Sequence, residues 1–479
     1  MGTLTTNGPT WHLTRREALA GAAALTFAVP ALAHEPGREA SGKGPNFLFI
    51  MADDLGYADL SCYGQRDYST PVLDSLAAQG MKFTHGYANS AVCSATRFGL
   101  ITGRYQYRLR AGLEEPLGAG HFGLDPAHPT LPSLLRERGY HTGLVGKWHL
   151  GALPDFGPLQ SGYDEFWGNR GGGVDYFTHE VGGRPDLWDG DVPIEQQGYY
   201  TDLLATRSIA FLEARAADDK PWLLSLHLTA PHWPWEGNND AGREESERID
   251  AVTDPLNIAD YDGGSAQAYA DMVTSMDMNI GRILVRLAEL GMEQDTVVVF
   301  TSDNGGERFS LTWPFSGIKT ELLEGGIRVP LIVKWPGLVA PGSETEVPAL
   351  SMDFLPTFVA AAGGAPHRDF PSDGQNLRPV LMGAGLPQRD LAWRFHNKNQ
   401  RAFRRGQFKY LKIGPNEYLF NIIADPRERG NLAARMPEKF AELKMAWEAW
   451  NAGMLPDTAD ISSFGWTPDH MADRYTGEQ

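Results

Sequence analysis

Residues 266–305 read AQAYADMVTSMDMNIGRILVRLAELGMEQDTVVVFTSDNG, and this stretch decides the fold class. Its first 25 residues place apolar side chains at the three- and four-residue intervals of one helix face. A β-branched run follows at residues 296–301 and ends in the polar loop that holds Asp303 and Asn304. A helix, a buried strand and a polar loop in that order are typical of an α/β protein.

Three more apolar runs lead into polar loops. Residues 46–51 (NFLFIM) predict a buried parallel strand that ends just before Asp53 and Asp54. The other two runs, with the polar residues that follow them, are residues 141–145 with Lys147 and His149, and residues 222–228 with His232. Ligands of open α/β sheets bind outside the carboxyl ends of the strands. We therefore expect the four loops to converge, on a large mixed, mostly parallel sheet sandwiched by helices.

The pattern of apolar and polar residues changes after about residue 385. Short alternating runs at residues 401–413 and 417–423 predict strands, and residues 437–450 predict a helix. We therefore expect an α/β domain over residues 34–385 and a small C-terminal α+β subdomain over residues 386–479. Two stretches, residues 151–191 and 236–264, are expected to be long surface excursions of the kind that select substrates.

The N-terminus carries an export pattern. Arg15 and Arg16 precede an alanine-rich apolar run that ends in Ala31-Leu32-Ala33, which predicts a twin-arginine signal peptide over residues 1–33. The apolar run is shorter than the roughly 20 residues that span a bilayer, although a signal anchor is the alternative. We expect an exported protein, periplasmic or secreted, with no membrane attachment after cleavage.

The charge and the cysteine content of the chain limit its partners and its sources of stability. The 479-residue chain has a formal net charge of -18, which opposes nucleic acid as a partner. An anionic substrate would need local cations or a metal ion to reverse the sign of the field at the site. The two cysteines, Cys62 and Cys93, could form one bridge or two buried thiols, so disulfides cannot be the main source of stability.

The acidic strand ends predict a metal site. Taken singly, the Asp53-Asp54 pair could cap a helix and the Asp303-Asn304 pair could form a turn. Together they offer carboxylate and amide oxygens from two strand ends, which are the ligands that Ca²⁺ or Mg²⁺ prefers.

Residues 93–104 read CSATRFGLITGR, and a helix here would put Cys93 and Arg97 on one face. At this point the chain resembles the sulfatase family of formylglycine-dependent, arylsulfatase-like hydrolases in the alkaline phosphatase superfamily. Further motifs carry the resemblance through nearly the whole chain: NFLFIMADDLGYADLSCYG, TPVLDSLAAQGMKFTHGY, GLVGKWHLG, APHWP, VVFTSDNGG, KTELLEGGIRVPLIVKWPG, RRGQFKYL and EYLFNIIADPRERGNLA.

The resemblance implies a role for Cys93 as the residue that a maturation enzyme oxidises to Cα-formylglycine, whose hydrated aldehyde is the nucleophile. Ala95 stands where the family usually has proline. Calcium is the family's usual metal, with Mg²⁺ as the alternative. The implied metal ligands are Asp53, Asp54, Asp303 and Asn304, together with modified Cys93. Arg97 is implied to hold the formylglycine hydroxyls. The groups implied around the sulfate are Lys147, His149, His232 and Lys319.

These residues predict hydrolysis of an aryl or carbohydrate sulfate monoester to an alcohol and inorganic sulfate. His149 is expected to deprotonate the second hydroxyl, and His232 or Lys319 to protonate the leaving alcohol. His227 is the alternative to His232. Trp233 and Trp235 could stack on the substrate or pack in the core, and Glu324 and Arg328 could form an ion pair.

Two other functions stay open. One is a phosphonate monoester hydrolase or phosphodiesterase with the same nucleophile, because phosphoryl and sulfuryl groups share geometry. The other is a catalytically silent protein that binds sulfated glycans, if Ala95 prevents the modification of Cys93. The oligomeric state does not follow from the sequence.

Overall fold

The computed structural model describes residues 44–118, 122–250, 263–458 and 461, so the expected signal peptide at residues 1–33 lies outside the described residues. Residues 43–479 form one compact unit. Its centre is a ten-stranded sheet with the order β11-β2-β10-β9-β1-β8-β4-β5-β6-β7. The strands are β1 (Asn46–Ala52), β2 (Met81–Phe83), β4 (His141–Gly146), β5 (Glu165–Gly168), β6 (Trp188–Asp189), β7 (Val192–Pro193), β8 (Trp222–His227), β9 (Thr296–Ser302), β10 (Leu331–Lys334) and β11 (Ser343–Thr345).

The middle of this sheet is parallel. Strands β9, β1, β8, β4 and β5 pair in parallel with one another, in that order. β10 runs antiparallel to both β9 and β2, and β6 runs antiparallel to β5. The expected mixed, mostly parallel sheet is confirmed.

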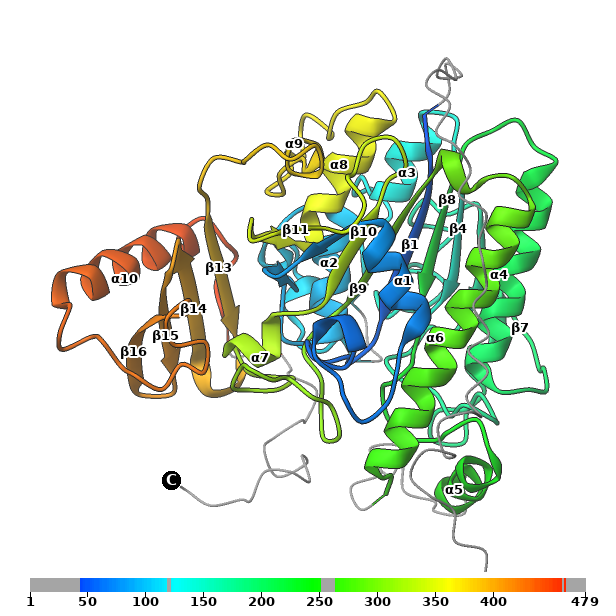
Figure 1. Ribbon diagram of the computed structural model, residues 1–479, viewed down its shortest axis with the longest axis horizontal. Coiled ribbons are helices and arrows are strands. Elements are labelled where there is room, and N and C mark those ends of the chain that lie inside the picture. The colour runs from blue at the N-terminus through cyan, green and yellow to red at the C-terminus, as the bar shows by residue number, and fades with distance from the viewer. Residues whose placement is uncertain (1–43, 119–121, 251–262, 459–460, 462–479) are drawn as a thin grey trace, which may run out of the picture. The chain divides into compact units, whose positions relative to one another are not determined.

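Helices cover both faces of the sheet. Successive side chains of a strand point to opposite faces, so a strand made of apolar residues gives both faces an apolar surface that helices bury. Phe47, Phe49 and Met51 of β1 belong to one apolar cluster, and Leu48 and Ile50 belong to another. Figure 1 shows α4 and α6 on one side of the sheet and α2, α3 and α8 on the other. The helices are α1 (Pro71–Gln79), α2 (Cys93–Thr102), α3 (Leu131–Arg136), α4 (Tyr200–Ala216), α6 (Ala266–Glu289) and α8 (Phe354–Ala361).

The two expected surface excursions contain regular structure that the sequence analysis missed. The stretch at residues 151–191 supplies β5 and β6, which extend the large sheet beyond β4. The stretch at residues 236–264 contains α5 (Asp240–Asp250). β5 has only four residues and β6 only two, so neither gives a run long enough to show an alternating pattern. Within the described part of the chain, no helix is long and apolar enough to cross a membrane.

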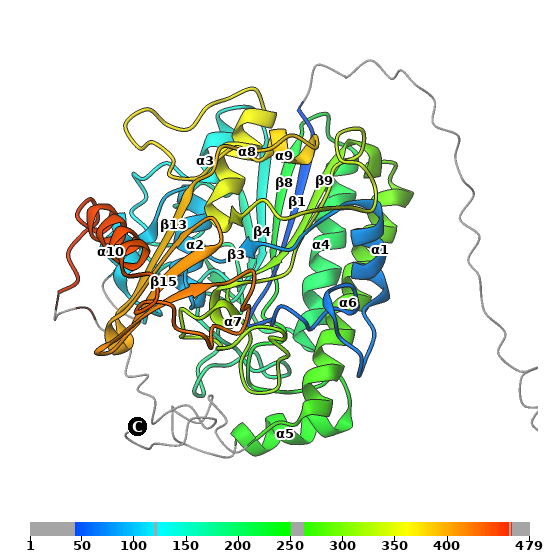
Figure 2. The same ribbon diagram turned by 60° about the vertical axis from the view of Figure 1, so that its left-hand side comes forward.

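A four-stranded antiparallel sheet with the order β13-β14-β15-β16 follows the large one in the chain. The predicted run at residues 401–413 divides into two strands because Gly406, with a φ of 59°, makes a turn within it. Figure 2 shows β13 on the side of the large sheet where α2 lies. The strands are β13 (Asp390–Phe395), β14 (Gln400–Arg405), β15 (Phe408–Ile413) and β16 (Asn416–Asn421), and the predicted helix is α10 (Pro437–Asn451).

The small sheet packs closely on the rest of the unit. Trp393 of β13 is fully buried, and its indole N–H donates to the carbonyl of Ala88 at 2.9 Å. Trp393 shares an apolar cluster with Ala95 of α2. The division of the chain at residue 385 stays a prediction. The remaining short elements are β3 (Gly86–Tyr87), β12 (Ala349–Leu350), α7 (Glu324–Ile327) and α9 (Arg378–Leu381).

Candidate functional site

Four loops meet at the carboxyl ends of β9, β1, β8 and β4, which are consecutive in the sheet order. This adjacency brings together side chains that lie up to 250 residues apart: Nδ2 of Asn304 donates to Oδ1 of Asp54 at 2.7 Å. The predicted site residues on these loops, all buried, are Asp53 and Asp54 after β1, Lys147 and His149 after β4, His232 after β8, and Asp303 and Asn304 after β9. The predicted convergence therefore occurs.

The acidic groups at this edge fit a hard cation. Ligand atoms of Asp53, Cys93 and Asp303 all lie within 4.8 Å of one another. Among the described residues, Oδ1 of Asp53 and Oδ1 of Asn304 are buried without a hydrogen-bond partner. Burial, followed by the neighbouring Asp303 carboxylate, raises the pKa of Asp53 well above its usual range. A divalent ion would relieve both the repulsion and the unpaired oxygens, and carboxylate and amide oxygens are its preferred ligands.

Three cationic side chains pair with the three carboxylates. Lys147, which is fully buried, forms an ion pair with Asp53. Arg97 donates to Oδ2 of Asp303 through Nη2 at 2.7 Å and through Nε at 3.1 Å. Nζ of Lys319 lies 2.6 Å from Oδ2 of Asp54. Because Oε2 of Glu307 also lies 3.9 Å from Nζ of Lys319, the site holds three cations and four carboxylates, and a bound divalent ion would make its net charge positive enough to attract an anion.

Cys93 is the first residue of α2 and lies beside His149. Its Sγ is 3.2 Å from Nδ1 of His149, whose Nε2 is 2.9 Å from the carbonyl oxygen of Leu117. Burial raises the pKa of Cys93 to about 11, so an unmodified thiol keeps its proton at neutral pH. Arg97 follows one turn later on α2, as the spacing predicted.

The two histidines of the site are neutral. Burial, with the nearby charges of Lys147 and Arg97, lowers the pKa of His149 well below its usual range. Burial and the ammonium of Lys319 do the same for His232. Nε2 of His232 lies 3.5 Å from Oδ2 of Asp54. A neutral imidazole can accept a proton at neutral pH.

The alternative histidine, His227, also lies near the site. It is the last residue of β8, and its Nδ1 is 3.3 Å from the carbonyl oxygen of Lys147. Burial and the charge of Arg97 lower the pKa of His227 to about 3. Because it contacts the backbone and not the Asp54 carboxylate, the geometry favours His232 as the histidine of the site.

The sequence of the chain matches a family model and several known proteins. The family model described as Sulfatase matches residues 45–365. The chain belongs to the sulfatase family. Rat steryl-sulfatase is 30% identical to this sulfatase, with 89% of this chain and 92% of the relative covered. Human arylsulfatase A is 33% identical, with 73% of this chain and 70% of the relative covered.

The fold of this sulfatase is also similar to that of a solved structure. The crystal structure of Ps i-CgsB in complex with k-i-k-neocarrahexaose matches this sulfatase with a TM-score of 0.77 and 27% identity, covering 88% of this chain and 95% of the other. The predicted family, fold class and enzyme class are confirmed: the sulfatase is a sulfuric ester hydrolase.

The structure of this sulfatase also shows the surroundings of the other residues that the sequence analysis named. Trp235 is buried, whereas Trp233 is partly exposed and lies with its ring centroid 4.4 Å from that of His232. Glu324 and Arg328 form the ion pair that the sequence left open, at 3.2 Å. Cys62 and Cys93 are both free cysteines, so the disulfide alternative is wrong.

Sequence reasoning missed a glycine loop that packs on both histidines. A Cβ on Gly172 would lie 2.6 Å from Cε1 of His149, and one on Gly173 would lie 3.1 Å from Cε1 of His232. The signal was present as the run of three glycines at residues 171–173. It was hidden because the surrounding stretch was expected to be a surface excursion.

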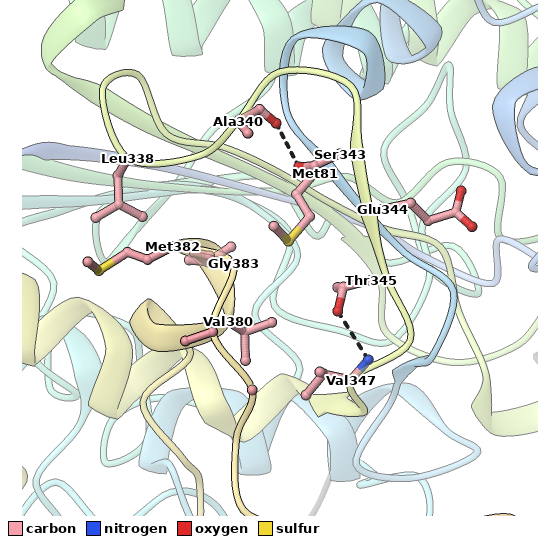
Figure 3. Close-up of a pocket in the computed structure, with 13 residues that line it drawn as sticks. Met81, Leu338, Ala340, Ser343, Glu344, Thr345, Val347, Val380, Met382 and Gly383 are labelled. Carbon is pink, nitrogen blue, oxygen red and sulfur yellow. Dashed lines mark hydrogen bonds between the residues drawn. The ribbon is translucent and has the colours of Figure 1, made fainter.

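The structure also contains a groove away from this site. Its volume is about 360 Å³, and it lies along the edge strand β11 (Figure 3). Met81, Val380 and Met382 give it an apolar lining, and Glu344 stands at its rim. None of the predicted site residues lines it. The groove therefore has no part in the candidate functional site.

Proposed function

We propose that this sulfatase hydrolyses sulfate monoesters with a nucleophile made from Cys93 by conversion to Cα-formylglycine. The observation that carries the proposal is the common position of Cys93, Asp53 and Asp303, whose ligand atoms lie within 4.8 Å of one another at the start of α2. The hydrated aldehyde would supply the oxygen that attacks sulfur, and its second hydroxyl lets sulfate leave without a separate hydrolysis step.

The oxygens at the ends of β1 and β9 would hold a calcium ion, or Mg²⁺, which would supply Lewis-acid chemistry toward the nucleophile and the sulfate. Its ligands would be Asp53, Asp54, Asp303, Asn304 and modified Cys93. The two unpaired oxygens of Asp53 and Asn304 support this assignment. Arg97, held against Asp303, would orient the hydroxyls of the modified residue.

The remaining groups divide between charge and proton transfer. Lys147 and Lys319 would bind sulfate oxygens, because both are buried ammonium groups beside the carboxylates. Burial opposes the charge on Lys319, but Asp54 and Glu307 outweigh it and raise the pKa of Lys319. The proton for the leaving alcohol would come from His232 or from Lys319. His149, within 3.2 Å of Cys93 Sγ, would accept the proton from the second hydroxyl.

The proposed substrates are aryl or carbohydrate sulfates. Trp233 supports this class because its partly exposed ring lies beside His232 and 5.9 Å from Nζ of Lys319. An aromatic face next to the leaving oxygen would accept a flat ring or the apolar face of a sugar. The names of arylsulfatase A and of the neocarrahexaose complex of Ps i-CgsB are consistent with either choice.

A matched pair of substrates tests the reaction. Turnover is measured on an aryl sulfate and on the aryl phosphonate monoester with the same leaving group. We expect the higher kcat/KM on the sulfate. A higher value on the phosphonate would favour the phosphonate monoester hydrolase or phosphodiesterase alternative, and no turnover of either would favour a silent glycan-binding protein.

Mass spectrometry tests the nucleophile. A proteolytic peptide that contains Cys93 should be roughly 18 Da lighter than its thiol form, the loss expected when CH₂SH becomes an aldehyde. The peptide that contains Cys62 serves as the internal control and should keep its thiol mass. An unmodified Cys93 in active protein would overturn the proposed nucleophile.

We propose further that the protein is exported by the twin-arginine route after a maturation enzyme has modified Cys93 in the cytoplasm. The support is the sequence pattern at Arg15 and Arg16, with cleavage after Ala33. Replacing both arginines by lysine should keep the protein in the cytoplasm, as judged by cell fractionation. Undiminished export of that variant would exclude this route.

A further inference from the structure

The segment that carries Lys319, residues 316–326, is held against the nucleophile loop. The N–H of Lys319 donates to the carbonyl of Gly306 at 2.9 Å, and the N–H of Thr320 donates to the carbonyl of Ala91 at 2.9 Å. Ala91 is two residues before Cys93. The backbone at residues 319–320 therefore sets the distance between the Lys319 ammonium and the Cys93 side chain.

This backbone is strained at Thr320, whose φ is 70°. A β-branched residue rarely adopts the left-handed region, where its side chain clashes with the backbone. Such a conformation persists only where surrounding contacts fix it.

Gln400, the first residue of β14 in the small sheet, makes those contacts. Its Oε1 accepts from the N–H of Leu322 at 2.9 Å, and its Nε2 donates to the carbonyl of Thr320 at 2.8 Å. Gln400 is only 3% exposed. One amide thus binds both ends of the short bend at residues 320–322, immediately after Lys319.

Other groups from the same part of the chain bind the ends of the segment. Oγ of Ser316 donates to the carbonyl of Arg427 at 2.7 Å, and the N–H of Glu324 donates to the Glu428 carboxylate at 2.6 Å. Nζ of Lys409, on β15, lies 2.9 Å from the carboxylates of both Glu324 and Glu428. These contacts fix the ends of the segment, whereas Gln400 fixes the bend itself.

We propose that Gln400 is a positioning residue for sulfate-ester hydrolysis, acting through Lys319. The inference rests on the proposed role of Lys319 in binding the sulfate. An amide suits this place because it donates and accepts at once, whereas a carboxylate only accepts and an apolar side chain does neither. The small C-terminal sheet would thereby take part in the reaction through the position of Lys319.

A double-mutant cycle tests the proposal. Gln400→Met keeps the length of the side chain and removes these two hydrogen bonds, together with the one that Nε2 donates to the carbonyl of Asn397 at 3.2 Å. The substitution is made in the wild-type protein and in Lys319→Ala. With Lys319 present, kcat/KM should fall at least about tenfold, because a displacement of about 1 Å can cost much of the rate. In Lys319→Ala the same change should cost less than about twofold, because the group through which Gln400 acts is gone.

The outcomes separate the inference from the proposed function. An equal loss in both backgrounds would overturn the role of Gln400 and leave that of Lys319 intact, whereas full activity of Lys319→Ala would overturn the role of Lys319. Gln407→Met, the same substitution at an exposed site of the same sheet, is the matched control and should keep wild-type activity. If thermal unfolding shows that Gln400→Met does not fold, Gln400→Asn answers the same question, because its shorter amide cannot reach both partners.

Discussion

Sγ of Cys93 and Nδ1 of His149 lie 3.2 Å apart, although 56 residues separate them in the chain. The contact exists because α2 begins at Cys93 beside the end of β4. The backbone of His149 is in the left-handed conformation, with a φ of 56°, which is uncommon for residues other than glycine. Strained backbone of this kind is concentrated at functional sites, where the surrounding structure maintains it.

Cys93→Ala should abolish turnover without unfolding the protein. The substitution removes the proposed nucleophile, while alanine is a good residue for the first turn of a helix. Steady-state kinetics and the thermal unfolding midpoint would measure the two effects. Cys62→Ala is the control, since Cys62 is the other free cysteine, and it should retain activity. Residual turnover by the Cys93 variant at the wild-type rate would remove Cys93 from the mechanism.

Asp303→Asn should weaken the response to calcium. After treatment with a chelator, added Ca²⁺ should raise the thermal unfolding midpoint of the wild-type protein, because a ligand that binds only the folded state stabilises it. The variant keeps the shape of the side chain but loses one charge beside Arg97, so both the shift and the activity should decrease. Asp295→Asn, at the exposed opposite end of β9, should behave as wild type. An unchanged shift in Asp303→Asn would place the ion elsewhere.

Gly172→Ala should lower kcat/KM by displacing His149. The added Cβ would lie 2.6 Å from Cε1 of the imidazole, which is already held at both nitrogens by Cys93 and the carbonyl of Leu117. We expect a loss of at least about tenfold, because catalytic groups tolerate little displacement. Gly385→Ala has no atom within 4 Å of its added Cβ and is the control. Equal activity of the two variants would show that the glycine loop does not constrain His149.

His85→Asn should make the protein less sensitive to acid. Burial, with the charges of Arg328 and Arg404, lowers the pKa of His85 to about 3 in the folded protein, below the usual 6.5. Its contribution to stability is therefore present above pH 6.5 and is lost as the pH falls toward 3. Between pH 7 and pH 5 the wild-type free energy of unfolding should fall by about 2 kcal/mol more than that of the variant. Urea unfolding at the two pH values measures this, and parallel losses would contradict it.

The large sheet and the convergence of its loops could be predicted because each central strand is a continuous apolar run. β1 and β9 are buried along their length, so their sequences show both the strand and its polar end. β5 and β6 could not be predicted, since strands of four and two residues carry no periodicity. Their position depends on pairing with β4 and with each other, which is information held by distant residues.

The same distinction applies to the site. Cys93, Asp303 and their neighbours lie in motifs that a resemblance can identify one by one. Gln400 lies in no such motif, because its importance comes from two backbone atoms near Lys319 that are 78 and 80 residues away in the chain. Gly172 gave a local signal, but the nearness of His149 becomes evident only once the fold brings the two together.

The hydrogen bonds between Gln400 of the small sheet and the bend after Lys319 limit how much of the C-terminus can be deleted. The family match ends at residue 365, and a chain cut there would retain all the proposed metal ligands, the cysteine to be oxidised and every cation beside them. It would nevertheless lose Gln400, Lys409 and Trp393, and expose the apolar surface that Trp393 covers. We expect such a fragment to misplace Lys319 and to aggregate. The shortest functional enzyme must extend past the last strand of the small sheet to at least Glu428, which also binds the segment.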